Sequence, residues 1–342
     1  MGLMRQTFRQ YFRPTKDELN ELWQRGLFSF DASVLLNVYA YSKKTREEFV
    51  EFVERNATRV RLPHQFGLEY SRNRSSVIVK QVNNYQKVEE VLRKVRDTDI
   101  APKYDHPYLS KKATRAYQAI LNELVESRRA IEKLIGSDPY AEKMFVAFDG
   151  RVGKCPSAEE LSRLNALAQE RYEKLIPPGF ADLKEKGIPG AYGDCIAWQQ
   201  LMEIANVEQK GIILVIDDEK DDWWLMESRT KRTLGPRPEL LEEFTTVTKQ
   251  QFYMYNSESF LRAAKEFTSA EIRDDVIEEV SLRLASQRET ERALDLKSVP
   301  SGTAIKGAEK DSAASMDKMS SLKTTSISDG NPGTDKLSSR TD

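Results

Sequence analysis

In the stretch ILVIDDEKDDWW, residues 213–224, an apolar run is followed directly by a run of acidic residues. The run has the length of a buried strand, and the acids after it are interrupted only by Lys220 before Trp223 and Trp224 close the segment. Carboxylates this close repel one another unless solvent or a cation offsets their charge. The stretch is therefore either a solvated turn or one part of a cation site at the end of a strand.

Composition limits the classes of protein that the chain can represent. Its 342 residues suffice for one large domain with insertions or for two small domains. The formal net charge of -1 means that binding to a polyanion needs a local basic patch. Cys155 and Cys195 are too few for a disulfide framework and favour a reducing compartment. His64 and His106 lie far from both cysteines in the sequence, which disfavours a structural zinc site.

The sequence offers no sign of membrane insertion. Its longest apolar runs have the length of strands, and its first residues, MGLMRQTFRQYFRP, lack the apolar region of a signal peptide. We therefore expect a cytoplasmic protein with no membrane partner.

Predicted strands alternate with predicted helices along the chain. Strands are expected at 27–30, at 59–63, at 211–217 and, with a turn, within 244–255. Helices are expected at 15–25, 45–56, 64–97 with a break near Ser75, 157–176, 194–209 and 269–289. Two of these helices begin with the capping-box pattern, Thr15 with Glu18 and Ser157 with Glu160. This alternation predicts an α/β fold with a parallel sheet covered on both faces.

The same pattern predicts how the chain is divided. Residues 1–26 form an N-terminal helix, and 27–79 together with 187–260 form the core. Residues 80–186 form a helical insertion lobe, and 261–298 form a C-terminal helical segment. Residues 299–342 are rich in Ser, Thr, Lys and Asp without periodicity and are expected to be a disordered tail.

Acidic residues occur where the predicted strands end. Asp31 follows the first strand directly, and Asp218 follows the run IILVI. Glu69 lies early in the helix after the second strand, and Asp194 opens the helix before the IILVI strand. The carboxyl ends of parallel strands meet at one edge of a sheet, so these four segments can bring carboxylates together. Such a set suits Mg²⁺ or Mn²⁺, and two ions about 3.5–4 Å apart can promote hydrolysis of a phosphodiester.

Each acid alone also has a plain structural explanation. Helix starts favour Asp and Glu by roughly 0.3–1 kcal/mol, which accounts for Asp194. A solvated turn accounts for the acids after the IILVI strand. Their convergence from four separate segments favours the metal site.

Four segments of the chain resemble the PIN-like domain family, in the subgroup with a long helical insertion. They are FDASVLLNVY (30–39), LPHQFGLEYSRNR (62–74), YGDCIAWQQLMEIA (192–205) and ILVIDDEKDDWW (213–224). The resemblance extends over roughly residues 27–255. It implies a three-layer α/β/α sandwich with a central parallel sheet, a metal-dependent nuclease activity, and RNA as the usual substrate.

The family's acidic residues correspond to particular positions of this chain. The resemblance places its first three acids at Asp31, Glu69 and Asp194, and its fourth at Asp218. The family usually writes the last motif Thr-x-Asp, and Ile216 here replaces the threonine. Asp217 or Asp222 could share the role of the fourth acid. The expected catalytic acids are thus Asp31, Glu69, Asp194 and Asp218, and the expected metal ligands are these four with Asp217 and Asp222.

Four further residues are candidates for binding substrate. Ser33 lies in the first motif and has a hydroxyl to offer, and Arg72 and Arg74 follow Glu69 with guanidinium groups that suit phosphate. Lys220 lies within the acidic run. The structural alternatives are that an arginine only pairs with Glu69 and that Lys220 only reduces the repulsion between the acids. Trp223 and Trp224 are expected in the core rather than as platforms for bases.

The leading hypothesis is a divalent-metal-dependent nuclease, with an endoribonuclease favoured, that hydrolyses phosphodiesters by metal-activated water with Mg²⁺ or Mn²⁺. The partner is nucleic acid, with RNA favoured over DNA. One alternative is a non-catalytic scaffold on the same fold. Another is a toxin or defence nuclease held by an inhibitory or regulatory protein. A homodimer is a further possible arrangement of the chain.

Overall fold

The computed structural model describes residues 3–100, 110–230 and 232–298. Residues 1–285 form one compact unit, which holds the whole sheet, and the unit boundary falls at residue 285. The predicted disordered tail, residues 299–342, lies outside the described residues.

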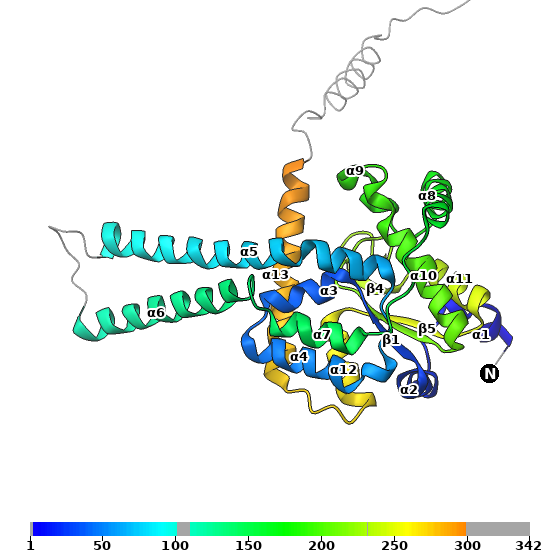
Figure 1. The fold of residues 1–342 in the computed structure, drawn as a ribbon, viewed down its shortest axis with the longest axis horizontal. Coiled ribbons are helices and arrows are strands. Elements are labelled where there is room, and N and C mark those ends of the chain that lie inside the picture. Colours follow the sequence, from blue (N-terminus) through cyan, green and yellow to red (C-terminus); the bar gives the residue numbers. More distant parts are fainter. Residues whose placement is uncertain (1–2, 101–109, 231, 299–342) are drawn as a thin grey trace, which may run out of the picture. The chain divides into compact units, whose positions relative to one another are not determined.

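Three short parallel strands form the central sheet. They are β1 (Leu27–Phe30), β2 (Ile212–Val215) and β5 (Phe252–Tyr255), in the order β1-β2-β5 (Figure 1). Leu27, Ile212 and Phe252 lie side by side in register. Every residue of β1 and β2 is buried, as expected for a sheet covered on both faces. A separate antiparallel pair consists of β3 (Trp224–Met226) and β4 (Thr233–Pro236).

Thirteen helices are assigned within the described residues. Their bounds are α1 Leu3–Thr7, α2 Lys16–Arg25, α3 Ala32–Asn37, α4 Lys43–Arg55, α5 His64–Val95, α6 Lys111–Lys133, α7 Pro139–Phe148, α8 Ala158–Glu173, α9 Leu183–Lys186, α10 Gly193–Glu208, α11 Pro238–Thr248, α12 Ser257–Phe267 and α13 Asp274–Ser298. Both predicted capping boxes are confirmed at the starts of α2 and α8. None of these helices is both long and apolar enough to cross a bilayer.

Aromatic side chains show that helices cover each face of the sheet. On one face, Trp23 of α2 and Phe260 of α12 pack against Phe28 of β1, with ring centroids 5.4 Å and 5.8 Å from it. On the other face, Trp198 of α10 packs against Phe252 of β5 at 5.2 Å. Phe28 and Phe252 differ in parity along the register, so they point to opposite faces. The predicted three-layer α/β architecture with a central parallel sheet is confirmed.

Three local predictions are wrong. The helix after Pro63 is continuous through Ser75, because that residue faces solvent while Ile78 and Val82 on the opposite side pack into the core. Residues 59–63 make only isolated bridges, Phe28 with Val60 and Leu62 with Val152, instead of a ladder.

The third error concerns residues 244–248, which are helical rather than extended. Pro238 starts α11, and Leu240, Phe244 and Thr248 follow at intervals of four on its buried face. The strand therefore begins only at Phe252.

The distal part of α5 and the whole of α6 lie side by side as an antiparallel hairpin (Figure 1). Arg128 Nε of α6 contacts Glu89 Oε1 of α5 at 2.8 Å. The predicted boundary between core and insertion at residues 79 and 80 falls inside the unbroken helix α5. The helix that starts in the core therefore also forms one side of the hairpin with α6.

We expect Phe260→Ala to lower the free energy of unfolding by about 3–5 kcal/mol. Phe260 is fully buried and its ring contacts those of Trp23, Phe28, Phe30 and Phe52. Urea denaturation measures the change. Phe145→Ala is the matched control, because that ring is 46% exposed and its loss should cost about 1 kcal/mol or less. Equal losses in the two variants would contradict the position of the core.

Candidate metal centre

Asp31 is fixed where β1 ends and α3 begins. Its backbone N–H donates to Val215 O at 2.9 Å, which extends the pairing of β1 with β2 by one residue. Its side chain caps α3, with Oδ2 accepting from the Ser33 N–H at 2.8 Å. The carboxylate is thereby held, buried, at the carboxyl edge of the sheet.

Glu69 reaches the same edge from the second turn of α5. Gln65 Nε2 donates to Glu69 Oε1 at 2.7 Å, and the Gln65 backbone N–H donates to Gln200 Oε1 of α10 at 2.9 Å. Gly193, the first residue of α10, leaves room for the carboxylate, since a Cβ there would lie 2.5 Å from Glu69 Oε1. Glu69 therefore lies against the start of α10.

Asp194 lies in the first turn of α10, where the helix dipole favours a negative charge. The indole of Trp223 donates to Asp194 Oδ2 at 3.1 Å. Asp194, Asp218 and Asp182 each offer an oxygen, and these three oxygens lie within 4.8 Å of one another. The segment 217–222 and α10 thus contribute to one cluster of carboxylates.

The other acids nearby act on the pKa values of Asp31 and Asp194. Burial raises the pKa of Asp31 to about 7, and the charges of Glu69 and Asp218 add to the effect. Burial raises the pKa of Asp194 well above its ordinary range, as do its charged neighbours Asp218, Asp182, Asp31 and Glu69. We call these five carboxyl groups, those of Asp31, Glu69, Asp182, Asp194 and Asp218, the acidic cluster.

Asp217 stands apart from the acidic cluster, although it precedes Asp218 directly. Its Oδ1 accepts from the Ser257 N–H and its Oδ2 from the Ser257 hydroxyl, both at 2.8 Å. Asn37 Nδ2 donates to the same Oδ2 at 2.8 Å. Adjacent residues of an extended chain point to opposite faces, so Asp217 is directed toward α12 and is taken up in packing.

Asp222 anchors a neighbouring loop through one carboxylate oxygen, whereas its Oδ1 is buried without a hydrogen-bond partner among the described residues. Its Oδ2 accepts from the backbone N–H groups of Gly179 and Ala181 at 2.8 and 2.9 Å. These bonds position the loop that leads into Asp182. Asp222 thus fixes the loop before Asp182, and its part as a metal ligand stays a prediction.

The four predicted substrate-binding residues fall into different environments. Ser33 bonds to Asp31, and Arg72 is exposed on α5 three residues after Glu69. Arg74 Nη1 contacts Asp138 Oδ2 at 2.6 Å, so this arginine is held by a buried carboxylate. Lys220 is paired with two acids of the cluster. Arg72 is therefore the one of these four whose exposure suits a phosphate backbone.

Asp182 and Lys186 also belong to the site, although neither was predicted from the sequence. Asp182 is only 2% exposed and lies in the Pro- and Gly-rich segment before α10, where a lone acid gives little signal. Its carboxylate contacts the Lys186 ammonium at 2.5 Å and also that of Lys220. The spacing of Asp182 and Lys186, four residues apart around the short helix α9, is the only hint that the sequence offers.

The acidic cluster fits a hard divalent cation. In the described part of the chain, Asp31, Glu69 and Asp194 receive hydrogen bonds from neutral groups, namely the Ser33 and Gln65 N–H groups and the Trp223 indole. Buried carboxylates without cationic partners are costly, which the raised pKa values of Asp31 and Asp194 express. Oxygen ligands of this kind are those that Mg²⁺ and Mn²⁺ prefer.

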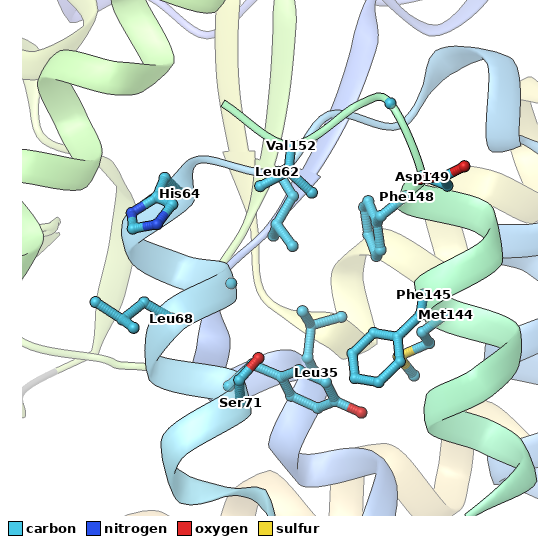
Figure 2. Close-up of a pocket in the computed structure, with 13 residues that line it drawn as sticks. Leu35, Leu62, His64, Leu68, Ser71, Met144, Phe145, Phe148, Asp149 and Val152 are labelled. Carbon is cyan, nitrogen blue, oxygen red and sulfur yellow. The ribbon is translucent and has the colours of Figure 1, made fainter. Parts of the chain in front are cut away.

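A separate apolar pocket of about 500 Å³ lies on another face of α5 (Figure 2). His64, Leu68 and Ser71 of α5 line it together with Phe145 and other residues of α7. No member of the acidic cluster lines this pocket. Its walls offer few of the oxygen ligands that a metal centre needs, so it is distinct from the candidate site.

A comparison with known families identifies the fold family of the chain. A family model described as PIN like domain matches residues 27–240, more than half of the chain, and confirms the resemblance found in the sequence. The match includes all five residues of the acidic cluster. Neither a curated protein nor a solved structure matches the chain.

We expect folding stability in EDTA to fall as pH rises from about 4 to about 7 through the titration of Asp31. A carboxyl group whose pKa is higher in the folded chain, here about 7 against an unfolded value of about 3.9, binds its proton more tightly when folded. The stabilisation is therefore complete below pH 4 and lost above pH 7. Asp31→Asn should remove roughly 2–4 kcal/mol of this pH dependence, measured by urea denaturation at pH 4.5 and 8. Asp221→Asn, at an exposed position, should leave the wild-type slope unchanged.

Gly193→Ala should weaken Mn²⁺ binding by roughly 10–100-fold with little effect on the melting temperature. The new Cβ would displace the Glu69 carboxylate, whose Oε1 lies 2.5 Å from that position. Isothermal titration calorimetry measures the affinity. Gly190→Ala is the control, because its nearest neighbour, Lys186 Cβ, lies at an ordinary 3.6 Å. If Gly193→Ala bound Mn²⁺ with wild-type affinity, Glu69 would not be a ligand of the metal ion.

Proposed function

The chain belongs to the PIN-like domain family, and on that premise we propose that it is a divalent-metal-dependent endoribonuclease. Proteins with PIN domains are in general nucleases. The observation that supports the proposal most directly is the convergence of Asp31, Glu69, Asp194 and Asp218, which come from four separate segments. Two of these segments end strands of the same parallel sheet, at the edge where α/β proteins form their sites.

The four acids would hold Mg²⁺ or Mn²⁺ between the end of the sheet and the start of α10. When bound, such an ion lowers the pKa of water and offsets negative charge on a phosphate group. The protein's own contribution is to fix the ligands. The Ser33 N–H orients Asp31, Gln65 orients Glu69, and the Trp223 indole orients Asp194. Attack of water on phosphorus with departure of the 3′-oxygen would leave 5′-phosphate and 3′-hydroxyl ends.

Substrate binding near these acids requires positive charge, because the polynucleotide is itself anionic. Arg72 is exposed on α5 and follows Glu69 by three residues, which places both on adjoining faces of the helix. A planar guanidinium group can contact two phosphate oxygens at once. We therefore assign Arg72 to the contact with the backbone of single-stranded RNA.

Metal-dependent cleavage is tested with labelled single-stranded RNA, tRNA and single-stranded DNA in Mn²⁺, Mg²⁺ or EDTA. We expect the wild-type chain to cut RNA only with a divalent ion. Asp194→Asn should reduce the rate by roughly 100-fold or more, since it removes a ligand at the centre of the acidic cluster.

Asp221→Asn controls for loss of negative charge nearby, because its side chain is exposed beside the acidic cluster. Undiminished cleavage by a folded Asp194→Asn chain would reject the assignment of this residue. Absence of cleavage of every substrate, together with no rise in melting temperature on adding Mn²⁺, would favour the scaffold alternative. Cleavage of DNA alone would change the substrate class and keep the metal centre.

A further inference from the structure

The Lys220 ammonium group contacts two of the three carboxylates that lie closest together in the acidic cluster. Its Nζ is 2.7 Å from Asp218 Oδ2 and also bonds to Asp182 Oδ1. Lys220 is the only basic residue in the run of acids from 217 to 222. An ammonium group thus lies between two side chains that could otherwise share a metal ion.

Asp182 is fully engaged by lysines. The Lys220 ammonium forms an ion pair with its Oδ1, and the Lys186 ammonium lies 2.5 Å from its Oδ2. These two cations hold the pKa of Asp182 below its usual range despite the opposing effect of its burial. A metal ion that approached either oxygen of Asp182 would therefore meet an ammonium group already bound there, whose positive charge opposes it.

A second contact between the same two segments supports the pairing of Asp182 with Lys220. Asp222, two residues after Lys220, accepts hydrogen bonds from Gly179 and Ala181 in the loop before Asp182. Asp222 is completely buried. The loop that carries Asp182 and the segment that carries Lys220 are thus tied together next to their ion pair.

We propose that Lys220 permanently occupies one cation position of the acidic cluster, so that the site accepts a single divalent ion. The inference rests on the proposed function, because it concerns the same metal centre. Asp31, Glu69, Asp194 and Asp218 would hold that ion, and Asp182 would act as the positioning residue for Lys220. Two ammonium groups already compensate part of the charge of the five carboxylates, which lowers the gain from a second divalent ion.

The test is the number of Mn²⁺ ions bound by the EDTA-treated full chain, measured by calorimetry and by electron paramagnetic resonance of the free ion. Wild type should bind one ion. Lys220→Met should bind two, because Asp218 and Asp182 then face each other without the ammonium group between them. Lys220→Arg retains the charge and should bind one.

Lys186→Met is the matched control, since it removes a lysine from Asp182 but leaves Lys220 on Asp218. It should bind one ion. Circular dichroism and the melting temperature establish that each variant is folded. For the wild-type chain, saturating Mn²⁺ should give no spectrum of a spin-coupled pair, a readout that needs no variant.

Two ions or a coupled pair in the wild type would overturn this inference and leave the proposed nuclease function standing. A folded Lys220→Met chain that bound only one ion would also overturn this inference, because Lys220 would then not be what excludes a second ion. No ion in any chain would overturn the inference together with the proposed function. A second ion in Lys220→Met alone supports it.

Discussion

The parallel pairing of β1 with β2 is the constraint on which the metal centre depends. Phe30 lies beside Val215, so Asp31 and the acids after Ile216 leave the sheet at the same edge. Asp31 and Asp218 have the same parity in this register and both turn toward the α10 face, whereas Asp217 has the other parity and turns toward α12. One shift of register would exchange the two neighbouring acids.

Buried carboxylates make the centre costly to fold, and the structure offsets this cost incompletely. Neutral donors satisfy Asp31, Glu69 and Asp194, and the two lysines compensate Asp182 and one side of Asp218. What remains is negative charge that raises the pKa of Asp31 and Asp194. This uncompensated charge lowers the stability of the metal-free chain. A cation that neutralises it therefore binds more tightly.

Local sequence signals predicted the parts of the structure that depend on neighbouring residues. The capping boxes of α2 and α8, the strand before Asp31 and the position of Asp194 in a first turn are of this kind. The environments of Arg74 and Lys220 depend instead on partners distant in sequence. Arg74 forms an ion pair with Asp138, and Lys220 forms one with Asp182. Neither pair could be found without the fold, because 64 residues separate Arg74 from Asp138 and 38 separate Asp182 from Lys220.

The helix that carries Glu69 is fixed at two points, which explains how an acid outside the sheet can share a site with strand-borne acids. Near its start, the Gln65 N–H bonds to Gln200 of α10. One turn beyond Glu69, Arg74 bonds to Asp138, whose other oxygen caps α7 through the N–H groups of Tyr140 and Ala141. Glu69 lies between these anchors on an unbroken helix, so its position is set by α10 and α7 together. The buried pair of Arg74 and Asp138 therefore contributes to the geometry of the metal centre, although neither residue touches it.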